Sequence, residues 1–151
     1  MKIALMKFLN SRAVILGTIL AGSLIFNPLA QAAEKAAAPV QIPASSAEIW
    51  QSIDKETAQL AALIQTGKFE EVHHHAFAIR DLVAALPTHS ASLSAGQLAQ
   101  VKSNSQFVAT LAERLDATGD AKDKAGTESN FRKLKNVLGV IRADYSTATR
   151  K

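Results

Sequence analysis

Cysteine is absent from all 151 residues of the chain, and its two methionines, Met1 and Met6, both stand near the N-terminus. Without cysteine there is no disulfide framework to support the fold and no thiol to carry a lipid anchor. Soft sulfur ligands are also the ones that Cu(I) favours. The composition therefore argues against a lipoprotein and against a dedicated Cu(I) carrier.

Long hydrophobic runs are scarce. The longest extends from Ala13 to Phe26, which is short of the roughly 20 residues that a membrane-spanning helix needs. It follows a basic start with Lys2, Lys7 and Arg12, and it precedes Ala30-Gln31-Ala32, a small-x-small cleavage pattern. These features predict a signal peptide over residues 1–33 and a periplasmic protein with no membrane span after cleavage. An uncleaved N-terminal anchor is the alternative.

Acidic residues are missing from the predicted signal peptide, which changes how the charge of the chain is interpreted. The segment contains three of the 17 Lys and Arg residues and none of the 13 Asp and Glu residues, so the remainder has 14 basic residues against 13 acidic ones. A net charge near zero removes the bulk attraction on which nucleic-acid binding depends. We therefore expect no nucleic-acid partner.

Strand patterns are also absent, because no segment alternates apolar and polar residues with a period of two. After a flexible Ala- and Pro-rich linker at 34–44, apolar residues recur every three or four positions in four segments. The predicted domain covers 45–151 and is all-α, with helices at about 46–66, 69–86, 95–118 and 121–146. Very short connections after the first and third helices favour an up-down-up-down antiparallel four-helix bundle.

Start and stop signals delimit these helices. Two pairs have the spacing of a capping box and predict the starts of the first and third helices: Ser45 with Glu48, and Ser94 with Gln97. Three residues are predicted to end helices: Gly67 the first, Pro87 the second and Gly119 the third.

Three consecutive histidines, His73 to His75, lie on the second predicted helix. Consecutive helical residues are about 100° apart, so the three imidazoles cannot converge on one ion while the helix is intact. Relative to the core-facing stripe, His73 and His75 fall to either side and His74 points to solvent. Glu70 stands four residues before His74, and Glu71 four residues before His75, a spacing that brings side-chain tips together.

Imidazole and carboxylate are both ligands for borderline divalent metals, so these pairs are candidate half-sites. Antiparallel packing would bring the end of the third helix and the start of the fourth toward the histidines, and that region carries Asp116, Asp120 and Asp123. The hypothesis is a composite site for Zn, Ni, Co or Cu(II) from His73 or His75 and one or two of these aspartates. The alternative is that the histidines shield the edge of the core and the carboxylates are ordinary helix-terminal charges.

Two aromatic residues, Trp50 and Phe77, lie beside the apolar stripes of the first two helices. They are candidates for an exposed interaction patch or a homodimer contact, and a wider core face is the alternative. For catalysis, the sequence offers no nucleophile-base pair and no Gly-rich phosphate loop, so we expect no enzyme.

The last predicted helix, NFRKLKNVLGVIRADY, resembles the last helix of cytochrome c-prime, an exported four-helix bundle in which a Phe precedes a C-x-x-C-H-x-x-Y haem motif. The two cysteine positions are occupied by Leu138 and Ile141, the histidine position by Arg142, and only Tyr145 matches. The b-type relatives need a methionine ligand, and none follows Met6. The resemblance therefore implies a haemless bundle.

Export, small size, a helical bundle and a histidine cluster also resemble the haemless periplasmic proteins that accompany heavy-metal resistance and efflux systems. That resemblance implies a non-enzymatic metal-binding protein that buffers a divalent ion or hands it to an efflux component. The competing hypothesis is an interaction module that docks on another periplasmic protein, with the histidines serving structure or sensing pH near their ordinary pKa of about 6.5.

Overall fold

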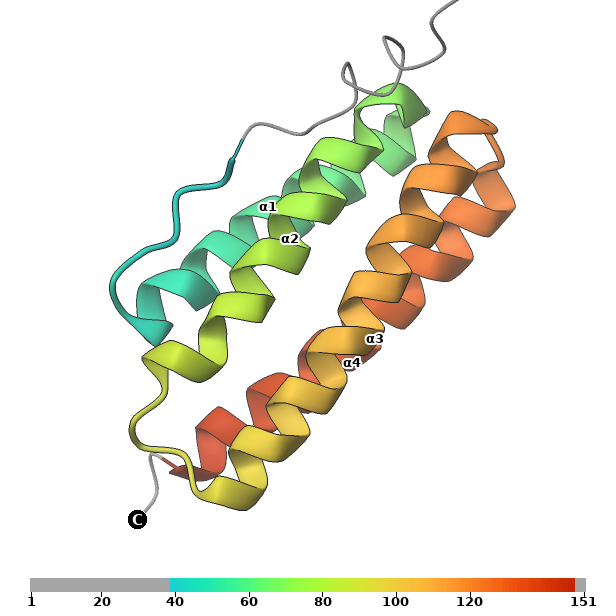
Figure 1. Ribbon diagram of the computed structural model, residues 1–151. Coiled ribbons are helices and arrows are strands. Elements are labelled where there is room, and N and C mark those ends of the chain that lie inside the picture. The colour runs from blue at the N-terminus through green and yellow to red at the C-terminus, as the bar shows by residue number, and fades with distance from the viewer. Residues whose placement is uncertain (1–38, 149–151) are drawn as a thin grey trace, which may run out of the picture. The chain divides into compact units, whose positions relative to one another are not determined.

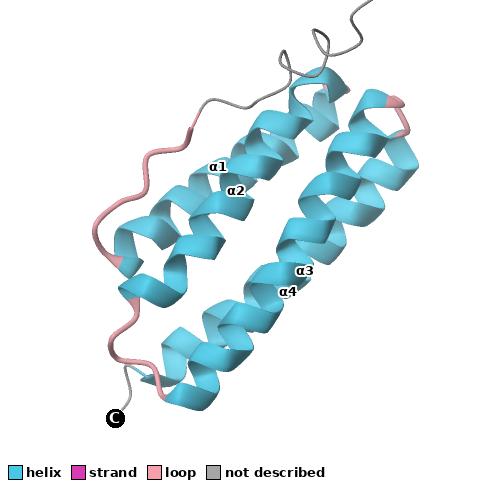
Figure 2. Cartoon of the chain, in the orientation of Figure 1, coloured by secondary structure: helices cyan, strands magenta, loops and turns pink. Residues whose placement is uncertain are grey.

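The computed structural model describes residues 39–148, and every regular element among them is helical (Figure 2). The predicted signal peptide, 1–33, and the first part of the predicted linker lie outside the described residues. The elements are α1 (Ser46–Thr66), η2 (Phe69–Glu71), α2 (Val72–Ala85), η3 (Leu86–His89), α3 (Ala95–Asp120) and α4 (Lys124–Ala148). The predicted all-α class is confirmed for this part of the chain.

Both predicted capping boxes form. The Ser45 and Ser94 hydroxyls accept from the backbone N–H groups of Glu48 and Gln97, whose side chains bond back to the cap residues. Gly67 ends α1 as predicted: its φ of 73° lies in the left-handed region, and the N–H of Lys68 reaches back to the carbonyl of Leu63. These local signals fix where α1 starts and stops and where α3 starts.

The second predicted helix, 69–86, is divided in the structure. Only Val72–Ala85 is α-helical, and a tighter 3₁₀ turn precedes it and another follows it. Pro87 occupies the beginning of the second turn, η3, where its missing N–H needs no helical acceptor. The α-helix therefore ends at Ala85, one residue before the predicted end, and the chain continues as the 3₁₀ turn η3.

Gly119 does not end the third helix, contrary to the prediction. It is buried within α3, and the turn falls later, at Lys122, which takes a positive φ of 53°. A Cβ atom at Gly119 would lie 2.9 Å from the carbonyl oxygen of Phe69 and 3.3 Å from Cβ of Val72. Glycine is therefore required here because α3 approaches the backbone at the start of α2, not because of a left-handed cap.

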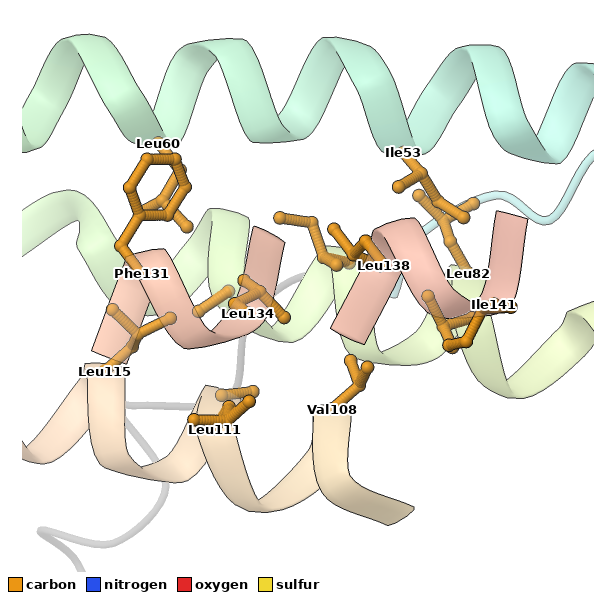
Figure 3. Packing of buried hydrophobic residues seen from close by; sticks show 14 of the residues in the cluster. Ile53, Leu60, Leu82, Val108, Leu111, Leu115, Phe131, Leu134, Leu138 and Ile141 are labelled. Atoms are coloured by element: carbon orange, nitrogen blue, oxygen red, sulfur yellow. The ribbon is translucent and has the colours of Figure 1, made fainter. Parts of the chain in front are cut away.

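The helices pack in chain order, α1 on α2, α2 on α3 and α3 on α4, as Figure 1 shows, and α4 also contacts α1, though less extensively. One apolar core runs between them, and its largest fully buried side chains include Ile53, Leu60, Ile79, Leu115 and Leu134. Phe131 of α4 reaches toward Leu60 of α1, as Figure 3 shows. Within the described residues, none of the helices combines the length and apolar character needed to cross a bilayer.

Candidate functional site

His75 lies at the interface between α2 and α1. Its Nδ1 atom is 2.6 Å from Oε2 of Glu56, and both side chains are about one fifth exposed. A carboxylate can only accept, so Nδ1 carries the hydrogen and the neutral ring presents Nε2 as its acceptor. The partner is therefore Glu56 from α1 and not Glu71, which the sequence spacing had suggested.

His73 is held in a similar way by the backbone. Its Nδ1 atom lies 3.0 Å from the carbonyl oxygen of Glu70. The carbonyl is an acceptor, so Nδ1 donates and Nε2 again carries the lone pair of the neutral ring. Glu70 contributes its backbone oxygen to this arrangement, while its carboxylate is exposed.

His74 is exposed, as predicted, yet its ring lies against that of His73. The two ring centroids are 3.8 Å apart, with the planes tilted by 40°. Loss of hydration, and then the charges of His73 and His75, lower the pKa of His74 from its ordinary value, and Glu71 opposes this shift. Two of the three imidazoles are thus neighbours although they are consecutive on the helix.

The end of α3 lies beside the start of α2, because Gly119 packs against Phe69 and Val72. Of the three predicted aspartate ligands, Asp116 is half-buried one helical turn before Gly119, and Asp120 is exposed at the last position of α3. Asp123 caps α4 instead: its Oδ1 atom accepts from the N–H of Gly126 at 3.0 Å. This is the role that the alternative interpretation gave to an acidic helix-terminal residue.

No group of three or more His, Asp or Glu side chains in residues 39–148 is arranged to hold a metal ion. The histidines are instead distributed over two faces of α2, with His75 toward α1 and the pair His73 and His74 toward the solvent edge. A metal bound here would therefore gather its remaining ligands from solvent, from side-chain rotation or from a partner.

Trp50 and Phe77, the predicted interaction residues, are both partly buried and pack against the core. The Trp50 ring meets Tyr145 edge-on, with centroids 5.7 Å apart, and the guanidinium of Arg142 lies 4.3 Å above its ring. Arg80 covers Phe77 at 4.6 Å. These contacts match the wider core face that was the alternative for both aromatics.

A groove between α1 and α4 is a feature that sequence patterns did not single out. It holds a cavity of about 230 Å³ lined by residues that include Thr57, Lys135 and Arg142, and a second of about 350 Å³ lined by residues that include Ile64 and Lys135. The ion pair of Arg142 with Asp54 spans the groove at 2.5 Å. One sequence signal pointed to this groove: Thr57 and Lys135 are polar residues directly beside the apolar stripes of their helices.

No protein-family model, curated protein or solved structure matches this chain. The function must therefore be inferred from the residues themselves.

Proposed function

We propose that this protein is a non-enzymatic periplasmic four-helix bundle that binds a divalent transition metal, Zn, Ni, Co or Cu(II), and buffers it or hands it to an efflux component. Export rests on the basic and apolar pattern of residues 1–33. An up-down-up-down arrangement is supported by contacts between opposite ends of neighbouring helices: the Gln97 side chain at the start of α3 donates to the carbonyl of Asp144 near the end of α4.

The observation that carries the metal proposal is the anchoring of the imidazoles through Nδ1. Metal-ligating histidines commonly donate their second ring N–H to a backbone carbonyl or a carboxylate, which fixes the tautomer and the direction of the coordinating nitrogen. His73 does so to the carbonyl of Glu70, and His75 does so to the carboxylate of Glu56. Both rings are thereby prepared to present Nε2 to an ion.

His73 is the better centre for the site. The ring of His74 lies against it, and the last turns of α3, which carry Asp116 and Asp120, pack beside the start of α2. His75 is fixed on the opposite side, toward α1, by Glu56. The proposed ligands are therefore Nε2 of His73, with His74 and an aspartate of α3 as further donors, and carboxylate and imidazole suit all four metals named above.

Metal-dependent stability tests this proposal. A metal that binds only the folded protein raises its free energy of unfolding by about 2.7 kcal/mol at 100 times its dissociation constant. Exchanging His73 and His74 together for Gln should remove most of this gain. His89→Gln is the matched control, because Nδ1 of His89 is also bonded to a carbonyl, that of Ala44, but η3 lies at the other end of α2. If His89→Gln removed the metal-dependent gain in stability and the double variant kept it, the assignment of the site to His73 and His74 would be refuted.

A second candidate function, docking on another protein or on a second copy of the chain, is favoured by one observation. Phe107 of α3 and Val140 of α4 are 58% and 56% exposed, the most exposed large apolar residues described. Sedimentation velocity of the wild type and of a Phe107→Ser, Val140→Ser variant tests self-association. A dimer that the double variant abolishes would support an interaction module.

A further inference from the structure

We propose that the groove between α1 and α4 binds an amphiphilic carboxylate: an anion with an extended apolar body. This site is independent of the histidines, which lie on α2. Its two cavities, about 230 and 350 Å³, follow one another along α1 and α4 and share Lys135 as a lining residue; together they are called the track. The larger cavity falls within the range of about 300 to 1,000 Å³ that is typical of small-molecule sites.

The track has an apolar floor. Ile53 and Leu138 line the first cavity, and Ile64 and Phe131 line the second. On α1 the lining residues extend from Ile53 to Gln65, which at 1.5 Å per residue is about 18 Å. A straight alkyl chain lying along the track would leave water and cover this floor, which is the favourable term for the apolar body.

The rim of the track is basic. Lys135, Arg132 and Arg142 face Asp54 and Glu128 around the two cavities. Arg142 is paired with Asp54, and Glu128 has a long contact of 3.9 Å with Lys124. Within residues 39–148, Lys135 and Arg132 have no carboxylate partner, and the Lys135 ammonium lies 4.9 Å from the centre of the Phe131 ring. The uncompensated charge at the join of the two cavities is therefore positive, which favours an anion.

Thr57 supplies the second, independent observation. Most helical hydroxyls in the described residues donate to the carbonyl four residues earlier, as Thr66 does to Ala62 and Ser52 does to Glu48. The Thr57 hydroxyl oxygen is buried and has no hydrogen-bond partner among the described residues, although Thr57 lines the first cavity together with Lys135. A buried donor without an acceptor is costly, and a rotation of the Thr57 side chain toward the first cavity would let a carboxylate oxygen there accept its hydrogen.

These features place the head and the body of the ligand. The carboxylate occupies the first cavity, where the Thr57 hydroxyl and the Lys135 ammonium donate to it, and the apolar body extends along Ile64 and Phe131. A cationic head of the same shape would lie beside the Lys135 ammonium, and the carboxylate of Asp54 in this cavity is already paired with Arg142. The site therefore discriminates by the charge of the head as well as by the length of the tail.

Calorimetric titration of the tag-free protein with dodecanoate below its micelle concentration tests the proposal, with dodecyltrimethylammonium as the cationic probe of equal tail. We expect one dodecanoate per chain at micromolar affinity and at least tenfold weaker binding of the cation. Thr57→Val keeps the shape and removes the donor, and Lys135→Gln removes the charge. Each should weaken dodecanoate binding about tenfold, the step expected from losing a charge-assisted hydrogen bond.

Lys133→Gln is the matched control, because Lys133 is exposed on the same helix and lines neither cavity. It should bind dodecanoate as the wild type does. Circular dichroism of each variant shows that it is folded, and Thr57→Val is expected to be at least as stable as the wild type, since it removes an unpaired buried hydroxyl. Equal binding of both probes, no binding of either, or unchanged affinity in the Thr57 and Lys135 variants would overturn the proposal.

Discussion

Gly119→Ala tests the packing that brings α3 to the histidine end of α2. The new Cβ would stand 2.9 Å from the carbonyl oxygen of Phe69 and 3.3 Å from Cβ of Val72, neither of which belongs to a flexible side-chain end. Overpacking of this kind costs about 2 kcal/mol, whereas replacing a helical glycine by alanine returns about 1 kcal/mol of helix propensity. The net expectation is a loss of about 1 kcal/mol in the free energy of unfolding.

Gly139→Ala is the matched control for this substitution. Gly139 is also an interior helical residue, in α4, but a Cβ there would have no neighbour within 4 Å. Only the propensity term applies, so the variant should gain about 1 kcal/mol. Urea unfolding followed by circular dichroism at 222 nm measures both changes. If Gly119→Ala were stabilised as much as Gly139→Ala, the close approach of α3 to Phe69 would be refuted, and with it the proximity of the α3 aspartates to His73.

Three further predictions concern contacts between helices. The hydrogen bond between Nδ1 of His75 and Oε2 of Glu56 joins α2 to α1. A double-mutant cycle with His75→Ala and Glu56→Ala, measured by urea unfolding, should give a coupling energy of about 1 kcal/mol. Additive losses of stability would show that the two groups do not interact. Burial raises the pKa of Tyr145, although its hydrogen bond with Ser90 opposes the shift. Absorbance at 295 nm, which reports the single tyrosine of the chain, should therefore titrate above pH 10, and higher still in Ser90→Ala. Because this pKa is raised on folding, its contribution to stability is complete below the unfolded pKa and is lost as the pH rises through the folded value; titration at or below pH 10 would contradict the burial. Arg142→Gln removes an exposed ion pair with Asp54 and should lower the free energy of unfolding by less than about 1 kcal/mol. It should also change the fluorescence emission of the single tryptophan, since the guanidinium lies over the Trp50 ring. Unchanged emission would exclude that contact.

Local signals were the part of the fold that could be predicted from the sequence. Ser45 and Ser94 cap helices because each hydroxyl accepts from the backbone N–H three residues later, and the acidic or amide side chain of that residue accepts from the backbone N–H of the serine. This arrangement needs no contact with another helix. Gly67 was predicted because glycine adopts the left-handed conformation of a helix C-cap without steric cost. Gly119 was not, because a glycine that permits a left-handed turn and a glycine that permits a close helix approach look alike in a sequence, and only the register between α2 and α3 distinguishes them.

The candidate sites depend on contacts between helices, which the sequence spacing left open. Glu71 stands at the correct spacing for His75, yet Glu56 of α1 is its partner. Glu56 occupies a position in the apolar, core-facing stripe of the first helix. A charged residue in such a stripe indicates that it has a partner on a neighbouring helix. The groove between α1 and α4 could not be predicted, since Thr57 and Lys135 are 78 residues apart in sequence and their proximity depends on how the two helices are aligned.

The most direct test of metal binding is isothermal titration of the tag-free protein with Zn, Ni, Co and Cu(II) in a buffer that does not chelate metals. The anchored imidazole of His73, with the His74 ring against it, predicts a one-to-one isotherm of micromolar affinity for at least one of these ions. His73→Gln should abolish this binding, whereas His89→Gln, at the other end of α2, should preserve it. Millimolar or absent heats with the wild-type protein would contradict metal binding and would leave the three histidines as part of the helix surface.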